Sequence, residues 1–220
     1  MRHAAAGLLS SCLLALLLTT PARAEGPSAA VAGLTRHDQD VLSAGKMVSR
    51  AMRFDDAGGH YVGGVSYQIV DARPEVVLAA LSDVANWSEA LPRTKSATLL
   101  PSATSADSER GLSRVELVQG SALVDARYTV VLEREGGDTI RFWLDPSRPH
   151  DIRDVWGFFR IRPMPGGRSL ITVGAALDLG DGLARMLFED KIASLMLRAP
   201  RHIRAFVEPR ALALGGGPAR

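Results

Sequence analysis

Between residues 61 and 179, hydrophobic and polar residues alternate in a series of short segments, which is the pattern of β-strands with one buried face. The alternation begins at residues 61–71, where Val65, Tyr67 and Ile69 occupy one face and Ser66 and Gln68 the other. Further strands are predicted at 95–100, 113–118, 126–135, 139–144, 155–163 and 169–179. The glycine pairs at 136–137 and 166–167 provide tight turns, so we expect neighbouring strands to run antiparallel.

Two stretches have the spacing of amphipathic helices instead. One follows Pro74, a residue tolerated in a first helical turn, and reaches Pro92, with Trp87 beside its hydrophobic stripe. The other is predicted at 182–208, where Pro200 should kink it. Its stripe consists of Phe188, Ile192, Leu195, Ala199, Ile203 and Phe206.

The residues before the first strand divide into three parts. Arg2, an apolar run and an Ala-x-Ala site predict a signal peptide at 1–24, with a membrane anchor or a lipoprotein site at Cys12 as alternatives. We expect a flexible lead-in and a short helix at 25–40, because Thr35 and Asp38 form a capping-box pattern. Residues 46–54 fit either a continuation of this helix or an edge strand.

These boundaries predict one domain at 41–208, followed by a loose tail at 209–220. Cleavage after Ala24 would remove two of the 26 basic residues and none of the 24 acidic ones, leaving 24 of each. Such a balanced charge gives no reason to expect nucleic-acid binding. The single cysteine is Cys12, so the exported protein would contain neither a disulfide nor a reactive thiol. We expect a periplasmic or extracellular location.

Catalytic and metal-binding motifs give little signal. The sequence has no G-x-G-x-x-G, P-loop, H-E-x-x-H, C-x-x-C or G-x-S-x-G motif. His150, Asp151 and Asp154 form the only dense His/Asp cluster, and its place in a connection between strands makes it a weak metal site. No cofactor and no metal are predicted.

Four parts of the sequence together follow a known pattern: VDARPEVVLAALSDVANWSEALP, DARYTVVLERE, VWGFFRIRPMPGGRSLITV and the last helix. These stretches and the order of elements resemble the START-like, or SRPBCC, superfamily, whose members include polyketide cyclase/dehydrase and coenzyme Q-binding proteins. One departure is Leu78 or Ala79, where many relatives carry a bulky aromatic residue. The resemblance implies an α+β helix-grip fold, in which a curved antiparallel sheet of six to seven strands wraps around a long C-terminal helix.

A helix-grip fold implies a cavity between the sheet and the last helix. The residues expected to line it are Trp87, Tyr128, Phe142, Phe159, Phe188, Ile192 and Met196. Trp87 is either an aromatic gate at the mouth or an ordinary core side chain, and the Tyr128 hydroxyl is a polar contact for a ligand. Arg127, Arg141 and Arg160 alternate with these positions and should face solvent, unless Arg127 bends over the rim to hold a carboxylate or phosphate.

Three functions fit this pattern. The leading hypothesis is an exported, non-catalytic protein that binds a lipid or other hydrophobic small molecule and contacts membranes transiently. The second is an enzyme similar to polyketide cyclases and aromatases, in which Tyr128 and an inward Arg127 would act together. The third is a protein-interaction module whose core is filled.

Overall fold

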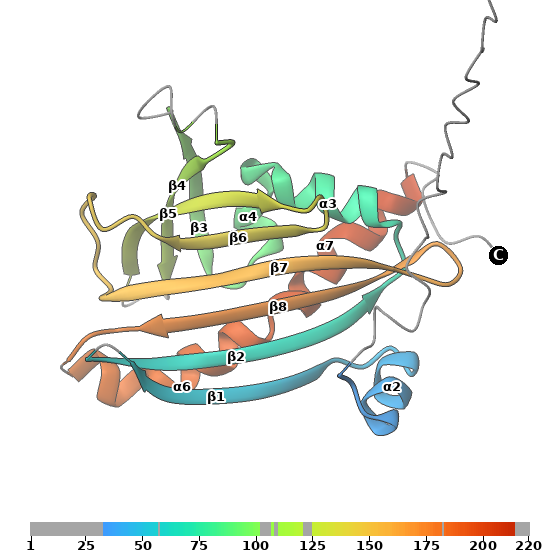
Figure 1. The fold of residues 1–220 in the computed structure, drawn as a ribbon, viewed down its shortest axis with the longest axis horizontal. Coiled ribbons are helices and arrows are strands. Elements are labelled where there is room, and N and C mark those ends of the chain that lie inside the picture. Colours follow the sequence, from blue (N-terminus) through green and yellow to red (C-terminus); the bar gives the residue numbers. More distant parts are fainter. Residues whose placement is uncertain are drawn as a thin grey trace, which may run out of the picture.

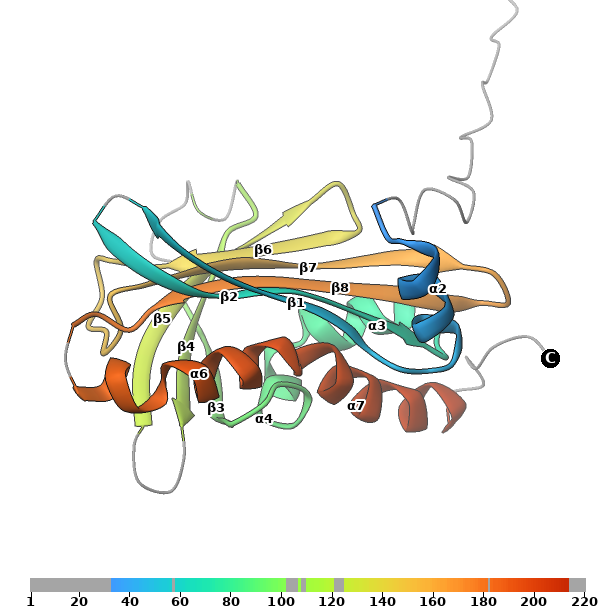
Figure 2. The same cartoon turned by 90° about the horizontal axis from the view of Figure 1, so that it is seen from below.

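The computed structural model describes residues 33–56, 58–101, 107, 110–120, 125–181 and 183–213, with only the backbone in 183–187. In this part of the chain, one curved sheet carries four helices on its inner face (Figure 1, Figure 2). They are α3 (Pro74–Ser82), α4 (Trp87–Ala90), α6 (Leu183–Leu197) and α7 (Ala199–Ala213). The predicted signal peptide at 1–24 lies outside the described residues. No helix within the described ranges is both long and apolar enough to cross a membrane.

The sheet contains eight strands in the described residues, arranged in the order β1-β2-β8-β7-β6-β5-β4-β3. Every neighbouring pair is antiparallel, as the turn residues predict. The strands are β1 (Val48–Asp56), β2 (Gly59–Val70), β3 (Thr94–Leu100), β4 (Ser113–Gly120), β5 (Asp125–Glu135), β6 (Thr139–Leu144), β7 (Asp154–Met164) and β8 (Arg168–Asp178).

The prediction of six to seven strands is too low by at least one, and the difference is β1. This strand pairs with β2 along its whole length and forms one edge of the sheet. Most of its side chains are exposed, so its sequence lacks the alternation that marks a half-buried strand.

Both faces of β2 are partly covered, rather than the apolar face alone. Ser66 and Gln68 are buried on the inner face, whereas on the other face Ile69 is buried and Val65 and Tyr67 are only partly covered. Gln68 pairs with Ile171 of β8 and therefore shares the inner face with it. The Gln68 amide donates a hydrogen bond to the Gly45 carbonyl oxygen at 3.3 Å, which satisfies this buried polar group.

The helix predicted between Pro74 and Pro92 is broken into three pieces. They are α3 (Pro74–Ser82), the 3-10 turn η1 (Val84–Asn86) and α4 (Trp87–Ala90). Asp83 has an extended backbone, and its carboxylate accepts a hydrogen bond from the Ala85 N–H at 3.1 Å. This local capping competes with a continuous helix and stops α3 one turn before Trp87.

The C-terminal helix is also divided, into α6 (Leu183–Leu197) and α7 (Ala199–Ala213). The break falls at Arg198, and Pro200 occupies the second position of α7, where a missing N–H costs little. The predicted kink is therefore confirmed. However, α7 extends five residues beyond the expected end at 208, so 209–213 are helical rather than loose.

The main core lies between the sheet and the helices α3, α4 and α7, where Ile203, Phe206 and Val207 of α7 are fully or almost fully buried. A smaller cluster around Leu42 packs the helix α2 (Arg36–Ser43) against Ile69 and Leu170. The predicted capping box of α2 is confirmed, because Thr35 and Asp38 exchange side-chain-to-backbone hydrogen bonds.

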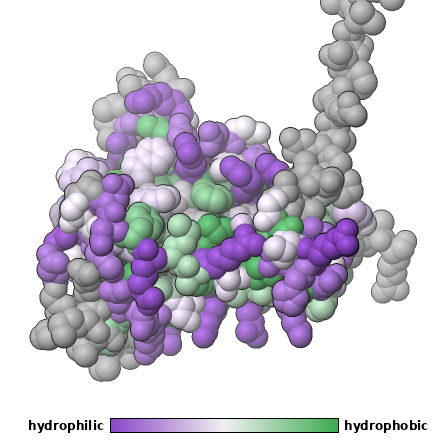
Figure 3. Space-filling model, turned by 60° about the horizontal axis from the view of Figure 1, so that its bottom comes forward, coloured by the Kyte–Doolittle hydropathy of each residue, from purple (hydrophilic) through white to green (hydrophobic). Residues whose placement is uncertain are grey.

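Away from α2, the outer face of the sheet is partly exposed and contains aromatic residues. Phe54 stacks on Tyr61 with ring centroids 5.2 Å apart, and Trp156 lies against both rings. Met52 and Trp156 are among the most exposed large hydrophobic residues. Figure 3, which turns the β1 edge of the sheet forward, shows hydrophobic side chains among hydrophilic ones on that side of the molecule.

Candidate functional site

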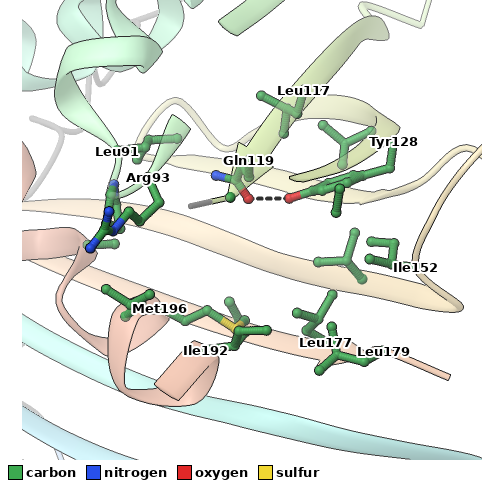
Figure 4. Close-up of a pocket in the computed structure, with 18 of the residues that line it drawn as sticks. Leu91, Arg93, Leu117, Gln119, Tyr128, Ile152, Leu177, Leu179, Ile192 and Met196 are labelled. Atoms are coloured by element: carbon green, nitrogen blue, oxygen red, sulfur yellow. Dashed lines mark hydrogen bonds between the residues drawn. The ribbon is translucent and has the colours of Figure 1, made fainter. Parts of the chain in front are cut away.

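A cavity of about 320 Å³ lies between the inner face of the sheet and α6. All seven residues predicted to line it do so: Trp87, Tyr128, Phe142, Phe159, Phe188, Ile192 and Met196. They come from five elements that are far apart in the sequence, and they converge because the curved sheet faces the helix (Figure 4). The volume is near the lower end of the range of about 300–1,000 Å³ typical of small-molecule sites.

The cavity lies under α6, whereas α7 packs tightly on the sheet. Phe188, Ile192 and Met196 on α6 are only partly buried and border the empty space. The same hydrophobic stripe continues into Ile203 and Phe206 of α7, which are almost inaccessible to solvent. One helical stripe therefore encloses a cavity along its first half and closes a solid core along its second.

Trp87 is a fixed part of the cavity wall. Its side chain is 2% exposed, and its indole N–H donates a hydrogen bond to the Leu81 carbonyl oxygen at 2.9 Å. The ring packs edge-to-face on Phe159, with centroids 6.0 Å apart. Of the two alternatives for Trp87, the structure therefore favours the core side chain, because the indole is buried and hydrogen-bonded.

The wall opposite α6 is built around two phenylalanines. The rings of Phe142 and Phe159 lie 5.4 Å apart in a tilted arrangement. Gly157, which pairs with Phe142 across β6 and β7, makes this arrangement possible, because a Cβ at this position would come within 2.5 Å of the Phe142 ring. Packing therefore fixes the shape of this wall.

A short chain of polar groups enters the apolar lining. The Tyr128 hydroxyl donates to the Gln119 side-chain oxygen (Figure 4), and the Gln119 amide donates to the Thr94 hydroxyl at 2.8 Å. Burial raises the pKa of the Tyr128 phenol well above its usual value, so the hydroxyl is uncharged at neutral pH. The Tyr128 oxygen can still accept a hydrogen bond from a ligand, and the Gln119 amide has one N–H left to donate.

The sequence analysis missed Gln119. It lies two residues after Leu117 and four after Val115, so a longer β4 would have placed it on the same face. The strand was predicted to end at 118, and Gln119 was therefore not considered.

The second residue missed is Arg93, in the connection from α4 to β3. Its side chain lines the cavity, and its backbone has φ 58°, the only positive value at a non-glycine position among the described residues. Its carbonyl oxygen accepts a hydrogen bond from the Gly120 N–H at 3.0 Å, which ties this connection to the end of β4. Lys191 of α6 also lines the cavity, and both cationic side chains are exposed.

The structure does not place Arg127 at the cavity. Arg127 follows the opposite face of β5 from Tyr128, its side chain is 60% exposed, and it pairs with Glu116 at 3.1 Å. The alternative in which Arg127 bends over the rim, and the predicted Tyr128–Arg127 pair of a cyclase, are therefore wrong. Arg141 also faces solvent, as predicted, and pairs with Glu135.

The His/Asp cluster does not converge on one point. His150 donates through Nδ1 to the Ile152 carbonyl oxygen at 2.6 Å, whereas Asp151 accepts from the Arg127 N–H at 2.8 Å. Asp154 accepts from the Tyr61 hydroxyl at 2.7 Å. The described ranges contain no group of three or more His, Cys, Asp or Glu side chains placed to hold a metal ion.

Comparison with solved structures gives the fold. The chain superposes on the Zhui aromatase/cyclase of a Streptomyces species with a TM-score of 0.55 and 14% identity, over 77% of this chain and 99% of that one. It superposes on a START superfamily protein from Mycobacterium smegmatis with a TM-score of 0.52 and 16% identity, over 76% and 98%. The chain has the helix-grip fold of START-like proteins.

A further similar structure is a STAR-related lipid transfer protein from Xanthomonas axonopodis, with a TM-score of 0.51, 15% identity, and coverage of 71% of this chain and 98% of that one. No protein-family model and no curated protein sequence matches this chain. Since an aromatase/cyclase and a lipid transfer protein share the fold, the fold does not choose between binding and catalysis.

Proposed function

We propose that this chain is an exported START-like protein that binds a lipid or other hydrophobic small molecule, without catalysis. The observation that carries this proposal is the cavity of about 320 Å³ between the sheet and α6, with apolar walls and one internal chain of polar groups. An open cavity also argues against the third hypothesis, an interaction module with a filled core.

The physical basis of binding is the burial of apolar surface. A hydrophobic ligand in water gains about 25 cal/mol for each Å² of apolar surface that the cavity covers. The walls formed by Trp87, Phe142 and Phe159 are already packed, so little side-chain ordering opposes binding there. Met196 supplies an adaptable surface on the α6 side.

The polar groups support binding rather than catalysis. A cyclase needs acid and base groups that converge on the substrate, each with a pKa near the working pH. The polar chain of this cavity consists of a phenol, an amide and a hydroxyl, and the raised pKa of Tyr128 makes its phenol a weak acid at neutral pH. These groups suit hydrogen bonding to a polar part of the ligand.

Export is proposed from the sequence of residues 1–24 alone. Expression of residues 1–220, followed by cell fractionation and mass measurement, tests it. A mass that begins at Glu25 in the exported fraction is the expected result. A full-length mass retained with the cells would contradict it.

Binding is tested by titrating residues 25–220 with the hydrophobic dye Nile red. The expected result is a saturable rise in dye fluorescence that added long-chain alcohols reverse, with each alcohol recovered chemically unchanged. The absence of a saturable rise would contradict ligand binding, whereas conversion of a bound molecule would favour the cyclase alternative.

A further inference from the structure

We propose that the ligand of this cavity is a single-chain amphiphile with an anionic headgroup, a carboxylate or phosphate, held at the mouth by Arg93 and Lys191. This inference rests on the proposed function and adds the chemical class of the ligand. Both cationic residues line the cavity, one from the connection after α4 and the other from α6.

Both cations lack a bound partner in the described part of the chain. Arg53, Lys95 and Arg114 each contact a carboxylate, whereas Arg93 and Lys191 form no ion pair or side-chain hydrogen bond there. An exposed guanidinium can bind both oxygens of a carboxylate or phosphate, and a lysine adds a second positive charge. Arg93 and Lys191 therefore offer two positive charges to an anion bound beside the cavity.

The carboxylates of the lining are already engaged. Asp125 forms an ion pair with Lys95 at 2.7 Å, and Asp151 accepts the Arg127 N–H at 2.8 Å. Asp151 also adjoins Ile152, which lies at the other end of the cavity from Arg93 (Figure 4). An anionic headgroup beside Arg93 thus meets positive charge without displacing an existing contact.

The size and polarity of the interior determine the rest of the ligand. A volume of 320 Å³ holds about ten groups of the size of a water molecule, each about 30 Å³, and a methylene group is of similar size. One medium-length chain therefore fits in this space. The charged headgroup remains in the exposed mouth, where it avoids the cost of burial.

The test compares dodecanoate with dodecanol, which have the same chain and differ in headgroup charge. Calorimetry on residues 25–220 at neutral pH and low salt should show dodecanoate binding about tenfold more tightly. Arg93→Gln and Lys191→Gln should each weaken dodecanoate binding about threefold, and the double variant should remove the preference. Dodecanol binding should change less than about twofold in every variant.

Arg127→Gln is the matched control, because Arg127 is also an exposed arginine but lies on the outer face. It should leave both affinities unchanged. Dodecyl phosphate should bind like dodecanoate, and inorganic phosphate alone far more weakly, which separates a headgroup from a free anion.

Two results would overturn the proposal while leaving the proposed function intact: equal affinity for dodecanoate and dodecanol, or a preference for dodecanoate that survives in the double variant. Inorganic phosphate binding as tightly as dodecyl phosphate would replace the amphiphile with a free anion. Failure of dodecanoate, dodecanol and Nile red alike to bind would instead contradict the proposed function itself.

Discussion

The indole N–H of Trp87 donates to the carbonyl oxygen of Leu81 at 2.9 Å, across the break between α3 and α4. This bond satisfies a carbonyl that the interrupted helix leaves without its usual partner. It also holds the indole against Phe159, so the break in the helix and the wall of the cavity depend on the same side chain.

We predict that Trp87→Phe destabilises the protein by about 1–3 kcal/mol, because the Leu81 carbonyl loses its hydrogen bond in a buried place. Urea unfolding measures the difference. Trp156→Phe is the control, since Trp156 is 44% exposed, and it should change stability by less than about 0.5 kcal/mol. Equal effects of the two substitutions would show that the Trp87 hydrogen bond contributes nothing.

Filling the cavity should block binding. Ile192→Trp places a larger side chain in the empty space beneath α6, so Nile red affinity should fall at least about tenfold, or 1.4 kcal/mol, while the protein remains folded. Leu212→Trp adds the same side chain at a position that is 68% exposed, and it should leave affinity unchanged. Unchanged affinity in a folded Ile192→Trp protein would place the ligand elsewhere.

The buried phenol of Tyr128 should make stability fall at high pH. Its pKa is raised by burial, so the folded state favours the protonated form, and this contribution is complete below the unfolded pKa of about 10. As pH rises above that value, the wild-type protein should lose stability more steeply than Tyr128→Phe. Urea unfolding at a series of alkaline pH values tests this, and parallel curves would contradict it.

Asp145 should have the opposite pH dependence. Burial opposes its ionisation, but hydrogen bonds from Ser147 and Arg114 outweigh burial and hold its pKa below the usual value. Its contribution is therefore present above a pH of about 4 and is lost as pH falls further. Asp145→Asn should cost about 1.5–3 kcal/mol at neutral pH, and this difference should shrink in acid.

Asp125→Asn provides the comparison for Asp145, because the Asp125–Lys95 pair is exposed on both sides. Its effect on the free energy of unfolding should be within about 1 kcal/mol. A neutral-pH loss from Asp145→Asn no larger than this, or one independent of pH, would mean that Asp145 does not stabilise the fold as an anion.

The fold was largely predictable from the sequence, because its strands alternate and its turns contain glycine. Each exception has a physical cause. The edge strand β1 has few buried side chains to mark it, and the capping of η1 by Asp83 breaks a hydrophobic stripe that is helical in its spacing. Burial of Gln68 on the inner face depends on Gly45, a tertiary contact that no local pattern contains.

The apolar lining was predictable for the same reason, since residues on the inner face of a sheet follow from alternation and from the resemblance to START-like proteins. The charged mouth was not. Arg127 looked suitable in the sequence but follows the outer face, whereas Arg93 lies in a connection with a left-handed backbone. The direction of a side chain in such a connection has no period to reveal it.

The most direct test of the central claim, that the cavity carries a hydrophobic ligand, is native mass spectrometry of the exported protein, purified without detergent. The account predicts a discrete added mass that is removed by organic extraction, is identified as an amphiphile, and is missing from the Ile192→Trp protein. A bare mass that stays bare after incubation with mixed lipids would contradict the account.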